Sequence, residues 1–243
     1  MANCSRREFV KTSCSILGSA LIFGCHKEEI SARSRWRGPP DERRAGFKYA
    51  MCNESMEELS WAEQCQLVGN AGYKGIEVAA FTLVKEGVQE ISPAERREMV
   101  STMKNAGIEC AGLHWLLAPP PKGLHFTTPD AAVRERSIAY LDELIDFCSD
   151  LGGPYMIFGS PNQRNTMGIS VEEAKKYFAQ GLASVADHAQ QRGVKILIEA
   201  LGKRTTDVIN TLAEALELAN RINHPAIHIM FDFNNTVDET QPY

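Results

Sequence analysis

The sequence lacks three features that would each assign a class of function directly. Its seven cysteines include no CxxC pair, which argues against a zinc cluster built on paired cysteines. No GxGxxG, GxxxxGKS/T or GxSxG motif follows an apolar run, which excludes Rossmann, P-loop and α/β-hydrolase sites. The apolar stretch at residues 16–24 is also short, because a helix that spans a bilayer needs ~20 residues.

What is present is an ordinary globular composition with an uneven charge distribution. Hydrophobic residues make up 44% and charged residues 23%, which excludes a disordered chain, a collagen and a disulfide-rich mini-protein. Residues 1–44 hold nine basic and five acidic side chains, which leaves 17 basic and 26 acidic ones in residues 45–243, a net charge of −9. An acidic body repels phosphate backbones, so we expect no nucleic acid partner.

The cysteines outside the N-terminal segment lie far apart and inside apolar patterns. They are Cys52, Cys65, Cys110 and Cys148. Unpaired cysteines of this kind are usually buried, and we interpret all four as small hydrophobic core residues.

The first 45 residues have the pattern of an export signal followed by a tether. Residues 5–11 (SRREFVK) resemble the twin-arginine signal, so we predict an export signal over residues 1–25. The sequence IFGC ending at Cys25 loosely resembles a lipobox, and a lipid there would be the protein's contact with a membrane. Residues 26–45 are charged and predict a linker. The expected location is the periplasm, either free or as a membrane-anchored lipoprotein; an ordinary basic N-terminus is the alternative.

From residue 46 onward, apolar runs alternate with amphipathic segments that begin at capping motifs. Four matches to the capping box predict helix starts, at Ser60…Glu63, Ser92…Glu95, Ser170…Glu173 and Thr211…Glu214. The predicted strands are residues 47–52, 75–80, 108–116, 155–159, 195–200 and 227–233. This alternation of mostly apolar strands with helices is typical of a parallel sheet covered by helices, an α/β fold.

Helix ends and chain length narrow the fold further. Glycines suited to a left-handed position after a helix stand at residues 72, 107, 152 and 193. Each β/α unit takes about 33 residues, and an eight-unit barrel takes ~250. Residues 46–243 therefore predict either an open six-stranded sheet or an incomplete (β/α)8 TIM barrel, truncated after the sixth strand.

Two carboxylates stand at the carboxyl ends of predicted strands. Glu199 ends one apolar run and Asp232 ends the next. In parallel β/α folds the site lies at the carboxyl ends of the strands, and neighbouring strands are only ~4.8 Å apart. The two side chains are thus placed to share one divalent cation. The alternative is that each carboxylate caps a helix or pairs with an arginine.

Five short stretches carry a family resemblance. They are GYKGIE (72–77), GLHW (112–115), FGSP (158–161) with Arg164, Ile198-Glu199, and MFD (230–232). In their order and spacing they resemble the sugar phosphate isomerase/epimerase family, the xylose isomerase-like TIM barrels. Four residues at the ends of strands five to eight bind Mn²⁺, Mg²⁺, Co²⁺ or Zn²⁺ in that family. The resemblance implies that Glu199 and Asp232 are metal ligands; the family's further His and Glu have no counterpart in residues 1–243.

The activity implied by the resemblance is a metal-dependent isomerase or epimerase of a sugar, a sugar phosphate or a keto acid. It acts through an enediolate, by proton transfer at the carbon α to a carbonyl, with Glu199 as the catalytic base. The implied substrate-binding residues are His114, Trp115, Ser160, Arg164 and Asn235. Some members carry a histidine at the position of Asn235, so the substrate of the best-known epimerases does not carry over. The oligomeric state is left open, a homo-oligomer included.

Two other functions remain open at this point. One is a non-catalytic exported sugar-binding protein, which the incomplete barrel favours. The other is a metal hydrolase similar to the barrel endonucleases, against which the acidic body and the few histidines at strand ends both argue. Because two of the family's four ligands have no counterpart, we expect weak turnover, or none, from residues 1–243 as they stand.

Overall fold

The computed structural model describes residues 47–239, so the predicted export signal and linker, including Cys25, lie outside the described residues. Six parallel strands form one sheet in the order β1-β2-β3-β4-β5-β6, so each strand pairs with its neighbour in the sequence. The strands are β1 (Ala50–Cys52), β2 (Gly75–Ala79), β3 (Glu109–His114), β4 (Tyr155–Phe158), β5 (Lys195–Glu199) and β6 (Ile227–Met230). This is the strand arrangement of a β/α barrel.

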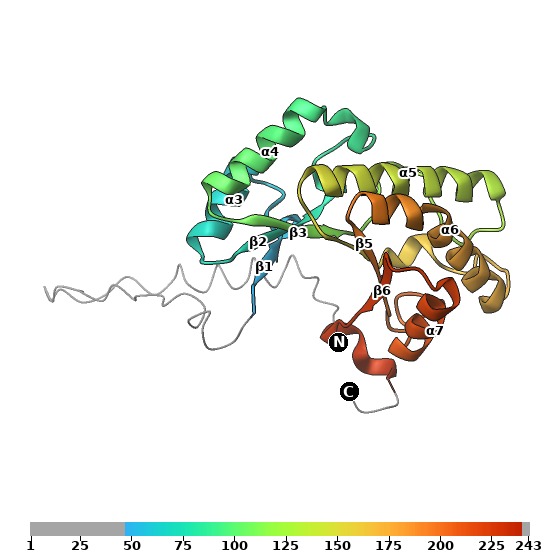
Figure 1. Ribbon diagram of the computed structural model, residues 1–243. Coiled ribbons are helices and arrows are strands. Elements are labelled where there is room, and N and C mark those ends of the chain that lie inside the picture. The colour runs from blue at the N-terminus through green and yellow to red at the C-terminus, as the bar shows by residue number, and fades with distance from the viewer. Residues whose placement is uncertain (1–46, 240–243) are drawn as a thin grey trace, which may run out of the picture. The chain divides into compact units, whose positions relative to one another are not determined.

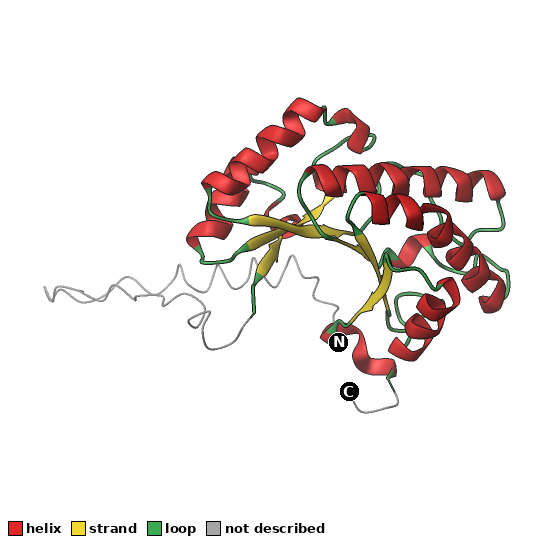
Figure 2. Ribbon diagram, viewed as in Figure 1, coloured by secondary structure: helices red, strands yellow, loops and turns green. Residues whose placement is uncertain are grey.

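Five α-helices lie along one side of the curved sheet (Figures 1 and 2). They are α3 (Trp61–Asn70), α4 (Pro93–Asn105), α5 (Ala131–Asp150), α6 (Val171–Gln191) and α7 (Leu212–Ile222). Five short 3-10 helices lie in the connections: η1 (Asn53–Met56), η2 (Ala80–Thr82), η3 (Val88–Glu90), η4 (Pro161–Gln163) and η5 (Phe233–Asp238). Within residues 47–239, no helix combines the length and the apolar character that crossing a membrane requires.

The helix signals in the sequence act as expected. Ser60 and Ser92 each form a complete capping box, with the side chain of the serine and that of the glutamate three residues later both bonded to backbone amides. Ser170 and Thr211 each accept a hydrogen bond from the third backbone amide of their helix. The glycines at 72, 107, 152 and 193 all have φ between 72° and 88°. Helix α5 begins instead at Asp130, whose carboxylate accepts from two backbone amides.

Several strands are shorter than predicted, and two of them end for a local reason. Strand β3 ends at His114 because Trp115 adopts a left-handed conformation with φ of 53°. Strand β6 ends at Met230 because Asp232 caps η5 and turns the chain. The candidate residues Glu199, Asp232 and His114 therefore lie at strand ends or in the turns that immediately follow them.

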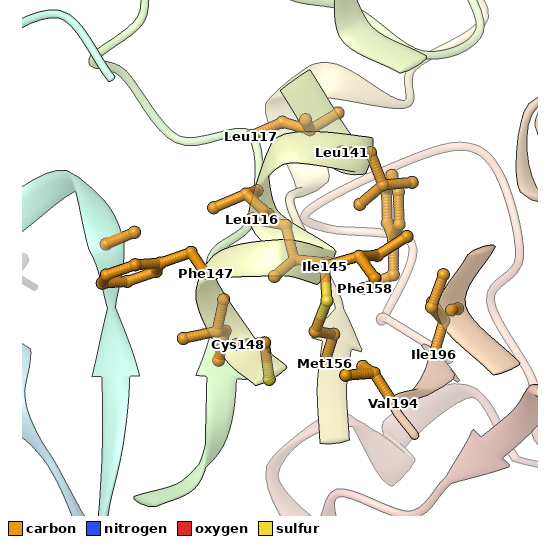
Figure 3. Packing of buried hydrophobic residues seen from close by; sticks show 14 of the residues in the cluster. Leu116, Leu117, Leu141, Ile145, Phe147, Cys148, Met156, Phe158, Val194 and Ile196 are labelled. Carbon is orange, nitrogen blue, oxygen red and sulfur yellow. The ribbon is translucent and has the colours of Figure 1, made fainter. Parts of the chain in front are cut away.

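Side chains of the sheet divide between a helix-covered face and an open face. In β5, Ile196 and Ile198 are fully buried, whereas Leu197 and Glu199 point to the other face and are half-buried. On the covered face, Leu141 and Ile145 of α5 pack near Met156 and Phe158 of β4 (Figure 3). The helices thus build the core, and the open face keeps room for polar side chains.

One surface cluster gives the stability a pH dependence. The imidazole of His188 on α6 lies 2.6 Å from Asp142 Oδ1 and 3.0 Å from Asp146 Oδ1 on α5. The hydrogen bond to Asp142 and the charges of both aspartates raise the pKa of His188. The resulting stabilisation is complete below the unfolded value of ~6.5 and is lost as the pH rises through the folded value.

We therefore expect wild type to exceed the H188Q variant in free energy of unfolding at pH ~5.5, by about 0.5–1 kcal/mol, because the cluster is partly exposed. The difference should shrink at pH ~8.5. Urea unfolding of both proteins at the two pH values measures it. Equal differences at both pH values would contradict the prediction.

Candidate active site

The carboxylates of Glu199 and Asp232 are joined by one amide. Glu199 ends β5 and pairs in register with Met230, two residues before Asp232. Asn235 in η5 donates through Nδ2 to Glu199 Oε1 at 3.0 Å and to Asp232 Oδ2 at 2.7 Å. All three side chains are half-buried. The structure thus brings together three of the residues singled out in the sequence.

The backbone around this pair holds each carboxylate in place. Asp232 Oδ1 accepts from the amide of Asn234 at 2.8 Å, which fixes the side chain at the start of η5. Gly159, directly after β4, leaves room for Glu199, because a Cβ there would overlap Glu199 Oε2. Two neighbouring strands and the turn after β6 are therefore all needed to position the pair.

The negative charge of the Glu199–Asp232 pair is not fully balanced by neighbouring groups. Burial, and then the negative charge of Asp232, raise the pKa of Glu199 to about 7, although Arg164 and Asn235 act in the opposite direction. Two carboxylates that face one another in this way fit a divalent cation, because Mn²⁺ and Mg²⁺ prefer oxygen ligands. Glu199 and Asp232 are the residues that would hold it.

Arg164 does not reach the open face. Its guanidinium is fully buried and donates from Nη1 to the carbonyls of Glu199 at 2.8 Å and Phe158 at 3.4 Å, and from Nη2 to that of Ile209 at 3.3 Å. Burial lowers the pKa of Arg164 to about 10. We expected this residue to bind substrate; in the structure it ties β4, β5 and the loop after β5 together beneath Glu199.

Two other expected substrate-binding residues lie in the turns after β3 and β4. Ser160 is buried with φ of 40°, and its Oγ accepts from the amide of Leu117 at 3.1 Å. It therefore joins the two turns. Trp115 is half-buried with φ of 53°, at the carboxyl end of β3. Its place as an apolar wall of a substrate site stays a prediction.

His114 lies in a second polar cluster, formed by the ends of β1 and β3 and the middle of β2. Cys52 and Glu77 are register partners, and Cys52 Sγ donates to Glu77 Oε2 at 3.1 Å. The imidazole Nδ1 of His114 is 3.5 Å from the same oxygen, and Nε2 is 3.6 Å from Glu54 Oε2. Burial, and then the charge of Glu77, raise the pKa of Cys52.

The interpretation of Cys52 as a core residue is wrong, although it is correct for the other three cysteines, which are buried. Cys52 is half-buried and contacts a carboxylate. Its position at the end of a predicted strand, the criterion that selected Glu199 and Asp232, was the available signal.

Comparison with known proteins identifies the fold. The sequence model of one protein family, described as the xylose isomerase-like TIM barrel, matches residues 65–242. The chain belongs to this family. The predicted family and barrel fold are confirmed, and the described residues contribute six of its strands.

Relatives of this xylose isomerase-like chain include sugar epimerases. A probable ketose 3-epimerase of Synechocystis sp. is 29% identical over 130 residues, which are 49% of this chain and 42% of that protein. The match therefore spans less than half of the curated relative. A solved D-psicose 3-epimerase, studied with D-fructose, has a TM-score of 0.70 at 20% identity, covering 80% of this chain and 67% of the other. A 3-keto-D-glucoside 4-epimerase from E. coli has a TM-score of 0.67 at 15% identity, covering 80% and 72%.

Proposed function

We propose that this protein is a metal-dependent ketose epimerase whose base is Glu199. The observation that carries the proposal is the amide of Asn235, which holds the carboxylates of Glu199 and Asp232 together at the ends of β5 and β6. Membership of the xylose isomerase-like family and the names of its epimerase relatives support the same reaction.

The chemistry assigns a separate task to each residue. Glu199, as a carboxylate, removes the proton from the carbon next to the ketose carbonyl. Asp232 and Glu199 would hold a divalent cation, which when bound would supply the positive charge that stabilises the growing negative charge on the carbonyl oxygen. Asn235 keeps the two carboxylates at a fixed separation, and Gly159 leaves the space that Glu199 occupies.

The substrate class follows from the relatives and from the open face. The relatives named for ketoses act at carbon 3, which is α to the carbonyl at carbon 2. Return of a proton to the opposite face of that carbon gives the 3-epimer, whereas protonation at carbon 2 instead gives a 3-ketose. We therefore propose ketoses as substrates and epimerisation as the outcome.

Hydrogen–deuterium exchange tests the proposal at its first step. The chain is incubated with Mn²⁺ and D-fructose or D-psicose in D2O, and the proton at carbon 3 is followed by NMR. Exchange needs only the base and the cation, so it reports on Glu199 whether or not the epimer accumulates. We expect exchange that depends on Mn²⁺ and stops with a chelator.

The same samples distinguish the main alternative. Sugar binding without Mn²⁺-dependent exchange would overturn the epimerase and favour a non-catalytic sugar-binding protein. Exchange that persists in the presence of a chelator would exclude the proposed role of the cation in stabilising the negative charge on the carbonyl oxygen.

A further inference from the structure

Three potential metal ligands of different chemistry lie at the ends of β1 and β3 and in the middle of β2. One thiol, one carboxylate oxygen and one imidazole nitrogen, from Cys52, Glu77 and His114, all lie within 4.8 Å of one another. Strand β4 separates these strands from the strands of the Glu199–Asp232 pair in the sheet. We propose that Cys52, Glu77 and His114 form a second cation site, selective for Zn²⁺ and similar thiolate-binding cations.

The backbone places the three donors on one face, with His114 two residues further along its strand than the level of Cys52 and Glu77. Cys52 is opposite Glu77 in the parallel register, and Glu77 is opposite Gly112, two residues before His114. Since side chains alternate along a strand, Gly112 and His114 share a face. The separations of 3.1 Å from Sγ to Oε2 and 3.5 Å from Nδ1 to Oε2 suit donors around one tetrahedral ion.

His114 supplies the independent observation that points to a ligand. Only 8% of the residue is exposed, and neither ring nitrogen has a hydrogen-bond partner. Its two nearest carboxylate oxygens, at 3.5 and 3.6 Å, are beyond good hydrogen-bond distance. Buried imidazoles normally satisfy their nitrogens, so this ring is positioned for a partner that would sit between it and the other donors.

Glu54 contacts the ring nitrogen of His114 that does not face Glu77. With Nδ1 turned to the cation, Nε2–H of His114 faces Glu54 Oε2. At 3.6 Å this contact is not a hydrogen bond, but a shift of the ring on cation binding that shortened it to hydrogen-bond distance would fix the tautomer of His114 and strengthen its binding to the metal. The half-buried Glu54 therefore acts as a positioning residue and not as a ligand.

The donor types determine the preferred cation. Thiolate and imidazole ligands suit Zn²⁺ and Co²⁺, whereas carboxylate oxygens alone suit Mn²⁺ and Mg²⁺. The cluster on β1, β2 and β3 and the Glu199–Asp232 pair thus differ in the cation that each prefers. Three protein ligands also leave one tetrahedral position open, as in zinc sites that take a water or a substrate oxygen.

Cobalt binding to the full chain tests the site. Co²⁺ bound to a thiolate gives a ligand-to-metal charge-transfer absorption in the near ultraviolet, and added Zn²⁺ should abolish it. We expect this band in wild type, in the D232N variant and in the matched cysteine control C65A, and its loss in C52S. Circular dichroism checks that each variant is folded.

The outcomes are distinct. A wild-type cobalt spectrum without the thiolate band would overturn the site, and a band that persists in C52S would assign the thiolate to another cysteine. We expect E54A to keep the band but to weaken Zn²⁺ binding about 10–100-fold, as for other groups that support a metal-binding histidine. If E54A bound Zn²⁺ as tightly as wild type while H114N lost the band, only the role of Glu54 would be excluded. The site formed by Cys52, Glu77 and His114 would stand. Deuterium exchange at the Glu199–Asp232 pair is a separate readout, so the two proposals can fail independently.

Discussion

Replacing Glu199 by Gln should reduce the Mn²⁺-dependent exchange at carbon 3 by about 10²–10⁴-fold, the usual contribution of a positioned base. Glutamine preserves the size of the side chain, and its oxygen can still accept from Asn235 Nδ2. It cannot take a proton from carbon. The measurement is the initial rate of deuterium incorporation, with E98Q on the exposed side of α4 as the matched control.

A second variant separates loss of the base from loss of the cation. D232N removes one carboxylate from the pair but leaves Glu199 in place. Its exchange rate should recover, at least in part, at higher Mn²⁺ concentration, whereas that of E199Q should not. Wild-type exchange in E199Q at any Mn²⁺ concentration would contradict the assignment of the base.

Replacing Arg164 by Met should lower the free energy of unfolding by roughly 3–5 kcal/mol. The fully buried guanidinium bonds to the carbonyls of Phe158, Glu199 and Ile209, and methionine would leave all three without this partner. Urea denaturation of wild type and R164M measures the change.

The lysine variant is the matched control for charge. R164K keeps a positive charge but not the planar fork that reaches carbonyls on both sides, so it should be nearly as unstable as R164M. A stable R164M, within about 1 kcal/mol of wild type, would show that the three carbonyls find other partners. A stable R164K with an unstable R164M would show that charge matters more than geometry.

Local patterns were sufficient to predict most of the fold. The capping boxes at Ser60 and Ser92 and the left-handed glycines act within one turn of the chain, so each can be identified without knowledge of its neighbours. The positions of Glu199 at the end of β5 and of Asp232 two residues after β6 follow from apolar runs of the right length. The parallel sheet then dictates that these two side chains are neighbours.

The remaining features depend on contacts between segments that are distant in the sequence. The burial of Arg164 depends on the loop that contains Ile209, and no local pattern around Arg164 distinguishes it from a surface arginine. The cluster of Cys52, Glu77 and His114 requires the register of three strands, including the shift between Ile76 and Glu77. Sequence alone singled out Asn235 as a candidate substrate-binding residue, but it did not predict that Asn235 would link two carboxylates.

The strand order also determines the order in which the strands can pair during folding. Each described strand pairs only with strands adjacent to it in the chain, so no unit must wait for a distant partner before it pairs. Such a sheet can grow one β/α unit at a time as the chain leaves the ribosome. The zinc-type donors of the first three strands would then come together before β5 and β6 are made. Glu199 and Asp232 would be added afterwards, onto a scaffold of strands that is already formed.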